Sequence, residues 1–283
     1  MINQMKIGIL SVNPHLYSNQ RLIEAFQNRG HLTKIINYTE SFYKLGDTSN
    51  EFDIIIPRSW HKIIYEFFVN LNSHTNSKLY VLNTMPSILL SKNRIFTLQK
   101  LAQNGIAIPT TLVGSILNKN NYEDFKTLFQ SNSFLVKPIY GSQGRDIKLI
   151  QNRVEWDGLK LQLNFEYYFQ EFIQESRGVD LRVLVLGKNI IGGMIRKNKT
   201  HFLSNIHQGG IGEKVDLTKE EKDLALNVAS ILKLDFVGVD ILRSNRGPLV
   251  IDINSTPGFE GLDKALKIDT AGLIADYTLK IIQ

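Results

Sequence analysis

The sequence predicts an α/β N-terminal domain with a parallel sheet, followed by a longer α+β part with an antiparallel sheet. In the first ninety residues, short apolar runs alternate with an amphipathic segment, which is typical of parallel strands joined by a helix. From about Ser91 onward, strand-like runs follow one another more closely. The chain has 283 residues, of which 43% are hydrophobic and 21% charged, so it can form two or three packed subdomains.

The N-terminal domain begins with an apolar run at residues 5–12, which we interpret as a strand. The amphipathic segment 18–30 follows and ends in Gly30, a residue suited to the C-terminus of a helix. No GxGxxG motif follows the first strand, which argues against a dinucleotide-binding domain. Further strands are expected at 32–38, 52–58 and 77–83.

The remaining part begins with a helix at 93–105 that Gly105 closes, followed by a strand at 106–114 with Pro109 near its start. The later segments alternate between strand patterns and helix patterns in an order typical of an antiparallel sheet covered by helices. We expect helices at 122–130 and 218–233 and at the end of the chain, and strands at 134–139, 146–150, 166–174, 181–187, 189–196, 236–243 and 248–254.

Composition narrows the class of protein. No stretch reaches the roughly 18 to 20 apolar residues of a membrane helix, and the opening lacks the apolar region of a cleavable signal, so we expect a cytoplasmic protein without a membrane partner. The absence of cysteine excludes disulfides, thiolate metal sites and a cysteine nucleophile. The net charge of +6 arises from scattered residues and does not favour a nucleic-acid partner. The six histidines show no metal-ligand spacing.

A candidate phosphate site follows the strand at 134–139. Lys137 would end this strand as a positive charge, and a turn with two glycines would let backbone N–H groups approach phosphate oxygens. This is not the P-loop pattern, and a glycine hairpin taken alone is more often an ordinary turn. The turn residues are Gly141, Ser142, Gln143 and Gly144.

A candidate metal site lies near the end of the chain. Asp252 and Asn254 alternate with apolar residues and therefore point to one side of their strand, and the tight turn at 244–247 can place Asp240 opposite Asp252. Carboxylates inside apolar strands repel each other unless a cation lies between them. Oxygen ligands favour Mg²⁺ or Mn²⁺. The alternative is that these polar groups face water on an edge strand.

Two further segments are weaker candidates. Residues 170–173 form an extended segment that can present backbone groups to an adenine edge, with acidic Asp180 beyond it. Taken alone, this pattern is better explained by an ordinary strand entering a hairpin. Arg196 precedes a loop with Asn205 and paired glycines, which suits anionic oxygens. The alternative for this loop is a polar surface. The residues of the first segment are Gln170, Glu171, Phe172 and Ile173.

The order and spacing of these segments resemble the RimK-like branch of the ATP-grasp superfamily, that is, the ribosomal protein and alpha-L-glutamate ligases, over almost the whole chain. The landmarks are residues 5–31, 98–109, 134–144, 170–173, 178–187, 204–210, 237–261 and 268–274. The resemblance implies three subdomains: a pre-ATP-grasp domain at 1–90, a central ATP-grasp subdomain at 91–168 and a C-terminal ATP-grasp subdomain at 169–283. It implies that ATP lies between the last two, with two divalent ions bridging its phosphates.

The resemblance also implies roles for individual residues. Arg94 corresponds to a basic nucleotide-binding residue and Lys137 to the phosphate lysine, while residues 170–173 correspond to the adenine-binding segment. Asp180 corresponds to an acidic nucleotide contact. Asn205 lies in the loop near phosphate and acceptor, and Asp240, Asp252 and Asn254 correspond to the metal ligands. This chain departs from the family at two positions, with Asp252 in place of the usual glutamate and Leu203 in place of the usual arginine.

The expected activity is ATP-dependent amide formation through an acyl-phosphate. Arg182, Arg196 and Asn205 would hold the acyl-phosphate and the substrate carboxylate, with ATP and Mg²⁺ (or Mn²⁺) as cofactors. The expected substrates are an amino acid, glutamate being favoured, and a peptide or protein C-terminal carboxylate, and we expect a homo-oligomer. The alternatives are a ligase that modifies a ribosomally made peptide, a small molecule or a carrier-protein acid, and a non-catalytic nucleotide-binding regulator.

Overall fold

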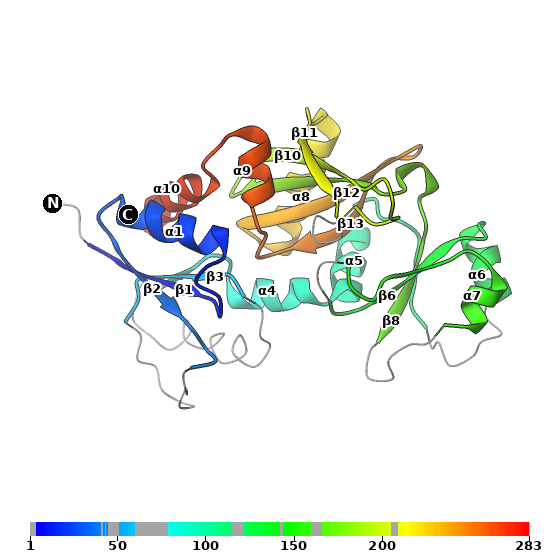
Figure 1. The fold of residues 1–283 in the computed structure, drawn as a ribbon, viewed down its shortest axis with the longest axis horizontal. Coiled ribbons are helices and arrows are strands. Elements are labelled where there is room, and N and C mark those ends of the chain that lie inside the picture. Colours follow the sequence, from blue (N-terminus) through cyan, green and yellow to red (C-terminus); the bar gives the residue numbers. More distant parts are fainter. Residues whose placement is uncertain are drawn as a thin grey trace.

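The structure, a computed structural model, describes residues 4–40, 42, 44, 51–59, 79–114, 122–141, 144–159, 166–204 and 209–282. In this part of the chain three sheets follow one another along the length of the molecule (Figure 1). A parallel sheet lies at the N-terminal end, a five-stranded antiparallel sheet in the middle and a four-stranded antiparallel sheet at the other end. This architecture confirms the predicted α/β N-terminal domain followed by α+β subdomains. No described helix has the length and apolar composition of a membrane span.

The N-terminal sheet has the strand order β2-β1-β3-β4, and all of its pairings are parallel. Its central strand β1 is buried from Ile7 to Leu10, which explains the continuous apolar run in the sequence. Gly8 allows close packing, because a Cβ there would lie 2.5 Å from Cδ1 of Ile36. The strands are β1 (Lys6–Leu10), β2 (Leu32–Ile36), β3 (Ile54–Pro57) and β4 (Tyr80–Val81).

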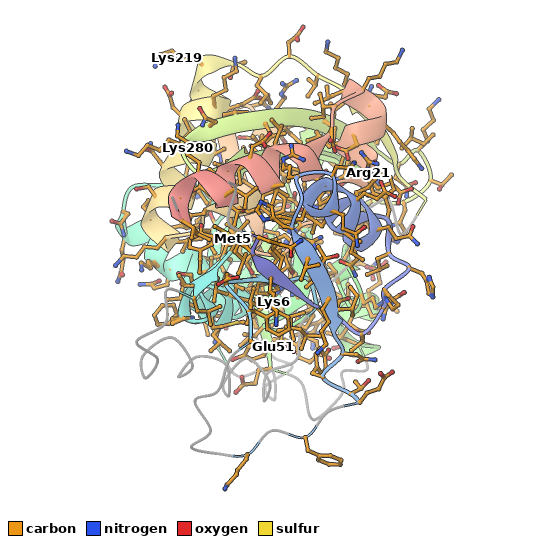
Figure 2. All side chains as sticks on the ribbon, turned by 90° about the vertical axis from the view of Figure 1, so that its left-hand side faces the viewer. Met5, Lys6, Arg21, Glu51, Lys219 and Lys280 are labelled. Atoms are coloured by element: carbon orange, nitrogen blue, oxygen red, sulfur yellow. The ribbon has the colours of Figure 1, made fainter. Side chains whose placement is uncertain are left out.

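One face of this sheet is covered by helices from both ends of the chain. Helix α1 (Tyr17–Gln27) packs along helix α10 (Thr270–Ile282), and the two lie side by side in Figure 2. Ile7, Phe26 and Ile274 belong to one buried cluster. The last helix therefore completes the core of the first domain.

The middle sheet has the strand order β11-β10-β9-β12-β13 and is antiparallel throughout. Helix α8 (Lys219–Leu232) packs on one face of this sheet. The side chain of Thr218 caps its N-terminus by accepting from the Glu221 N–H, and Lys233 ends it in a left-handed conformation, so the helix expected at 218–233 is confirmed. The strands are β9 (Val179–Leu186), β10 (Asn189–Lys197), β11 (Ile211–Lys214), β12 (Phe236–Ser244) and β13 (Gly247–Asn254).

The other face of the middle sheet shares a core with the N-terminal domain. Leu184 and Phe236 of the middle sheet lie in the same buried cluster as Ile7, together with residues of helix α9 (Glu260–Leu266). Buried Asn83 fixes the junction: its Oδ1 accepts from the Phe236 N–H at 2.7 Å and its Nδ2 donates to the Phe236 carbonyl at 2.6 Å. The two domains therefore pack as one unit.

The third sheet is antiparallel and has the strand order β5-β8-β6-β7; the parallel sheet is called the N-terminal sheet, and this one the four-stranded sheet. Its outer face packs on helices α6 (Tyr122–Phe129) and α7 (Arg153–Asp157) through an aromatic cluster that includes Phe134 and Trp156. Only a short part of the strand expected at 106–114 pairs in this sheet, because Ile106 packs into the core of the middle sheet instead. The strands are β5 (Thr111–Leu112), β6 (Phe134–Pro138), β7 (Lys148–Ile150) and β8 (Tyr167–Glu171).

Two helices connect the N-terminal domain to this sheet. They are α4 (Met85–Lys92) and α5 (Arg94–Gln103), and Asn93 between them caps α5 by accepting from the Phe96 N–H. Gly105 has a φ of +76°, as expected for the residue that closes a helix. A 3-10 turn (Gln174–Ser176) joins β8 to β9.

Candidate active site

A pocket lies where the four-stranded sheet meets the middle sheet. Strands β6 and β8 line it on one side, and β9, β12 and β13 line it on the other. Motifs that are far apart in the sequence therefore meet in one place. The predicted residues that line this pocket are Arg94, Lys137, Gly144, Gln170, Glu171, Phe172, Ile173, Asp180, Asp240 and Asp252.

The apolar walls of the pocket were not predicted. Leu135, Ile147, Phe202, Leu242 and Ile251 line it between the polar groups. Strand alternation could have indicated two of them, because Leu135 lies two residues before Lys137 and Leu242 lies two residues after Asp240. Such walls exclude water and strengthen the electrostatic interactions inside the pocket.

Lys137 is a buried cation whose hydrogen-bond partner is neutral. Its Nζ donates to Oε1 of Gln170 at 2.6 Å, and Nε2 of Gln170 donates to Oγ1 of Thr111 at 2.9 Å. Lys137 is only 7% exposed. Burial, opposed by the Asp252 carboxylate and assisted by the nearby Arg94 guanidinium, lowers its pKa to about 8. Gln170, expected at the adenine, therefore also orients the lysine.

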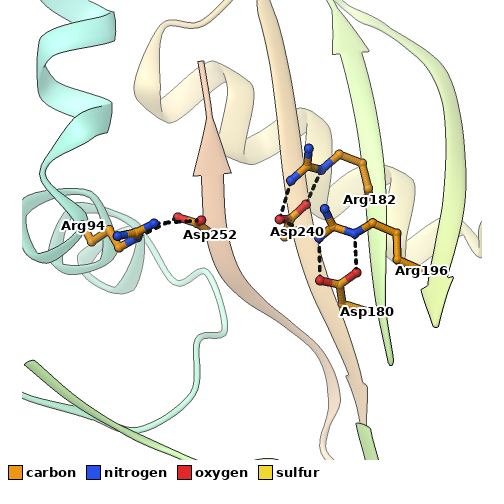
Figure 3. Close-up of polar contacts among 6 residues, drawn as sticks. All are labelled: Arg94, Asp180, Arg182, Arg196, Asp240 and Asp252. Carbon is orange, nitrogen blue, oxygen red and sulfur yellow. Dashed lines mark hydrogen bonds and ion pairs between the residues drawn. The ribbon is translucent and has the colours of Figure 1, made fainter. Parts of the chain in front are cut away.

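Arg94 bridges the two sides of the pocket mouth. Its Nε and Nη2 donate to the two carboxylate oxygens of Asp252 at 3.1 and 3.3 Å (Figure 3). The same guanidinium donates from Nη1 to the Pro138 carbonyl at 3.1 Å and from Nη2 to the Gly141 carbonyl at 3.0 Å. A single side chain thus connects β13 to the end of β6 and to the glycine turn.

A ladder of alternating charges crosses the neighbouring strands. Asp240 accepts hydrogen bonds from Nε and Nη2 of Arg182 at 2.5 and 2.6 Å. Nη2 of Arg196 forms an ion pair with it at 2.8 Å. Arg196 also donates from Nε and Nη2 to the two oxygens of Asp180, at 2.6 and 2.5 Å. Figure 3 shows the ladder on β9, β10 and β12, with Asp252 one strand away. We call these four residues the charge ladder.

The charge ladder sets the protonation of its carboxylates. Burial alone would raise the pKa of Asp240, but the adjacent Arg182 and Arg196 guanidiniums overcome this effect and hold the pKa below its usual range. Burial raises the pKa of Asp180, and the negative charge of Asp240 adds to this increase, while Arg196 opposes it. Asp240 is therefore the more firmly ionised carboxylate of the two.

Some predicted residues do not line the pocket. Arg182 and Arg196 lie behind the carboxylates that they bind, and Oδ1 of Asn254 accepts from the Thr256 N–H at 3.0 Å. Gly141 contributes its carbonyl to Arg94. Ser142, Gln143 and Asn205 lie outside the described residues.

Two residues close to Asp252 were not predicted. Lys92 ends helix α4, and burial lowers its pKa to about 8 against the attraction of Asp252. Tyr168 lies directly opposite Lys137 in the β6–β8 pair and is fully buried. Its hydroxyl has no hydrogen-bond partner in the described part of the chain, and burial raises its pKa. Tyr168 could have been predicted from the sequence, because it lies two residues before Gln170 on a strand and its side chain therefore points to the same face.

The donor set fits a nucleotide with a hard divalent cation. Asp240 lies opposite Asp252 in the β12–β13 register, as predicted, and Asn254 lies opposite Gly238 on the same strand pair. Carboxylate and amide oxygens suit Mg²⁺ when phosphates and water complete its shell. A buried lysine without a described carboxylate partner suits a phosphate. No cluster of three His, Cys, Asp or Glu side chains occurs in the described ranges, so the amide and phosphates would be needed to complete the shell.

Comparison with protein families identifies the fold. Residues 91–278 match the RimK-like ATP-grasp domain, and residues 5–88 match the RimK pre-ATP-grasp domain. The chain belongs to the RimK-like ATP-grasp family. It is therefore an ATP-dependent ligase, as the sequence predicted. The expected division at 168/169 falls within β8, which pairs in the four-stranded sheet.

Curated relatives of this RimK-like ligase match nearly its whole length. A probable alpha-L-glutamate ligase of Legionella pneumophila (strain Corby) is 35% identical over 291 residues, which cover 98% of this chain and 96% of the relative. A solved structure of a RimK domain ATP-grasp protein from Sphaerobacter thermophilus has a TM-score of 0.76 at 19% identity, covering 96% of this chain and 98% of that one. The ATP-grasp ligase PsnB, solved with a minimal precursor, Mg and ADP, has a TM-score of 0.74 at 16% identity, covering 100% and 99%.

Both departures of this RimK-like chain from its family lie at the pocket. Leu203, where the resemblance implied an arginine, lines the pocket with an aliphatic side chain. Asp252 also lines it, and its shorter side chain reaches Arg94.

Proposed function

We propose that this ligase joins an amino acid, glutamate being favoured, to the C-terminal carboxylate of a peptide or protein through an acyl-phosphate. The observation that carries the proposal is the meeting of Lys137, Arg94 and the carboxylates Asp240 and Asp252 at one pocket between two sheets. The two cations can neutralise the charge of a phosphoryl group during its transfer. The carboxylates, through a bound metal ion, can align the phosphoryl group.

In the first step the acceptor carboxylate oxygen attacks the γ-phosphorus of ATP, and ADP leaves. Lys137 and Arg94 would hold the phosphate oxygens. Asp240, Asp252 and Asn254 would hold Mg²⁺, which would supply positive charge to the phosphates when bound. In the second step the amine nitrogen attacks the acyl carbon, the carbon–oxygen bond to phosphate breaks, and the nitrogen releases a proton to solvent. The apolar walls keep water from the acyl-phosphate, which would otherwise hydrolyse.

Arg182 would act from behind Asp240, outside the described lining of the pocket. It lies on β9 opposite Asp240, is partly exposed, and donates two hydrogen bonds to Asp240. Because Arg182 does not line the pocket, its guanidinium would act on the acyl-phosphate through Asp240, while Arg196, more deeply buried, would position Asp180 and Asp240. Asn205, which follows Ser204 in the sequence and lies outside the described residues, would contribute an amide near the acceptor.

Two observations support the choice of substrates. The curated relatives that match almost the whole chain are named alpha-L-glutamate ligases, which favours glutamate as the added amino acid. Several structural neighbours were solved with a peptide bound, which supports a peptide acceptor in this fold. Both ATP and Mg²⁺ belong to the reaction, and two ions are proposed from the family resemblance.

The test is mass spectrometry of peptides ending in a free carboxylate after incubation with ATP, Mg²⁺ and mixed amino acids. We expect a mass increase of one or more glutamate residues and release of ADP that requires both the acid and the amine. ADP release without any acceptor, or nucleotide binding without turnover, would favour the nucleotide-binding regulator instead.

A second candidate is a ligase that modifies a ribosomally made precursor peptide. The full-length structural similarity to PsnB and to the macrocyclase MdnC, each solved with its precursor peptide, favours it. Such an enzyme would join two groups of one peptide, so the product would lose the mass of one water and gain no amino acid. The same mass spectrometry therefore separates the two candidates.

A further inference from the structure

The Arg94–Asp252 ion pair occupies two groups that the reaction needs for other partners. Arg94 is expected to bind phosphate and Asp252 to bind the metal, yet in this structure they bind each other through two hydrogen bonds of 3.1 and 3.3 Å. The side chain of Arg94 is 12% exposed and that of Asp252 is 38% exposed, so the pair lies at the wall of the pocket. Neither group can bind a new partner fully while this pair persists.

Lys137 provides the contrast. Its Nζ is bound by a neutral amide, and no carboxylate is hydrogen-bonded to it in the described part of the chain. A phosphate can therefore approach Lys137 without displacing a counter-ion. Arg94 differs because each of its nitrogens already donates a hydrogen bond, to Asp252, Pro138 or Gly141.

We propose that Arg94 couples nucleotide binding to metal binding by exchanging Asp252 for phosphate. In the free enzyme Arg94 neutralises Asp252 and keeps a divalent cation from it. When phosphate enters, the guanidinium turns to the phosphate oxygens, and the Asp252 carboxylate becomes available to the metal. This inference rests on the proposed function, because it places the nucleotide phosphates in this pocket.

The exchange makes metal and nucleotide bind cooperatively. Without nucleotide, a cation must compete with a guanidinium for Asp252; without a cation, phosphate must compete with a carboxylate for Arg94. Linkage requires that each ligand strengthens the other by the same factor, which is typically about 5- to 150-fold for coupled sites. Removing either partner of the pair should abolish this part of the coupling.

The experiment measures binding rather than turnover. ADP binding is followed by calorimetry with a chelator present and then with Mg²⁺, and Mn²⁺ binding is followed by electron paramagnetic resonance without nucleotide. The variants are Asp252→Asn, Arg94→Met and their double variant. Arg153→Met is the matched control, because Arg153 forms an exposed ion pair with Asp157 on α7 and lies outside the pocket lining. Circular dichroism confirms that each variant is folded.

We expect Asp252→Asn to bind metal-free ADP about 5-fold or more tightly than the original chain, and to gain little from Mg²⁺. Arg94→Met should bind Mn²⁺ without nucleotide more tightly than the original chain, while Arg153→Met should change neither affinity. Unchanged or weaker binding of metal-free ADP to Asp252→Asn would overturn the proposal. So would unchanged Mn²⁺ binding to Arg94→Met.

The double variant separates the exchange from a general field effect. Loss of a negative charge near the phosphates could strengthen ADP binding without involving Arg94. If the gain passes through the ion pair, Asp252→Asn should give no gain in the Arg94→Met background. A gain of equal size in both backgrounds would overturn the proposal. These readouts do not depend on the acceptor, so a chain that ligates no tested peptide would still pass or fail them.

Discussion

A protonated lysine at position 137 costs the folded protein free energy unless an anion binds to it. Burial holds the pKa of Lys137 at about 8, below the ordinary lysine value, so the charged form is disfavoured and the cost disappears as the pH rises above this value. A bound phosphate reverses the preference and favours the charged form. Nucleotide binding should therefore be linked to proton uptake when the pH exceeds about 8.

This linkage gives a prediction for the pH dependence of binding. The affinity for Mg-ADP should be nearly constant below pH 8 and decrease as the pH rises toward 9.5, because phosphate must then bind together with a proton. Lys137→Met removes the charged amine but keeps an unbranched apolar side chain of similar size. It should weaken binding by about 10- to 150-fold, the value of one charge-assisted hydrogen bond. It should also flatten the pH profile. Calorimetry at several pH values measures both effects, and a wild-type profile that stays flat to pH 9.5 would contradict this role.

The sequence predicted which residues line the pocket, but it did not predict which of them bind each other. Lys137, Gln170, Asp180, Asp240 and Asp252 were all predicted and all line the pocket. Their hydrogen-bond partners were not predicted, because the ion pair between Arg94 and Asp252 spans 158 residues of sequence and depends on how the two sheets meet. The hydrogen bond from Lys137 to Gln170 likewise depends on the pairing of β6 with β8.

At the scale of secondary-structure elements, the charge ladder ties three strands together. Asp240 is 4% exposed and receives hydrogen bonds from Arg182 on β9 and Arg196 on β10. A buried ion pair adds little net stability when complete, but loss of one partner leaves an unpaired buried charge. Substitution of Asp240, the central carboxylate of the charge ladder, should therefore cost more stability than substitution of a residue in an exposed ion pair.

We predict that Asp240→Asn lowers the free energy of unfolding by about 3–5 kcal/mol at neutral pH. The variant keeps the shape of the side chain but leaves two guanidiniums without their shared counter-ion. Because the pKa of Asp240 is lowered in the folded state, its contribution is present above the unfolded carboxyl value of about 4 and is lost as the pH falls through the folded value. Urea unfolding at pH 7 and pH 3 measures this, and a loss below about 1 kcal/mol at pH 7 would argue against the prediction.

Gly178 joins the start of β9 to the segment that lines the pocket. It has a φ of +67°, its N–H donates to the Phe202 carbonyl at 3.0 Å, and its own carbonyl accepts from the Asn198 N–H at 2.8 Å. A Cβ at this position would contact the carbonyl oxygens of Asn198 and His201. The segment before Ser204 is therefore held in place by a residue that must be glycine.

We predict that Gly178→Ala costs at least about 1–2 kcal/mol of stability, the usual penalty of a left-handed residue, and weakens ADP binding by displacing Phe202 and Leu203. Gly258→Ala is a suitable control, because a Cβ there meets no atom within 4 Å. Thermal unfolding and calorimetry measure the two effects. Equal ADP affinity in both variants would show that the segment does not need this anchor.

The sequence predicted the pairing of neighbouring strands better than the strand order of a whole sheet. The tight turn at 244–247 fixes the pairing as far as Ile241 opposite Val250. A register shift between Ile241 and Asp240, which the sequence did not indicate, then places Asp240 opposite Asp252. The order β5-β8-β6-β7 was beyond prediction, since a strand at 111–112 pairs with one at 167–171 across a long intervening stretch. Local sequence specifies a turn, whereas distant pairing depends on the packing of the whole core.

For the whole molecule, charge provides a test of the acceptor. The chain carries a net charge of +6, which would attract an acidic peptide over a distance that salt limits to about 8 Å at physiological ionic strength. Turnover on an acidic peptide should fall as salt rises, through slower encounter, while turnover on a matched neutral peptide should change less. Steady-state rates at low and high salt measure this. Equal rates for both peptides and for the free amino acid, at every salt concentration, would indicate a small-molecule acceptor.

The packing of α1 against α10 has a consequence for the synthesis of the protein. The core beneath the N-terminal sheet contains Ile7 and Phe26 from the start of the chain and Ile274 and Leu279 from near its end. The first domain therefore leaves the ribosome long before the helix that covers it. During this interval its apolar surface remains exposed and open to chaperones. A chain cut before residue 270 should show this surface permanently, bind a fluorescent hydrophobic dye and aggregate, even though its nucleotide pocket lies in other strands.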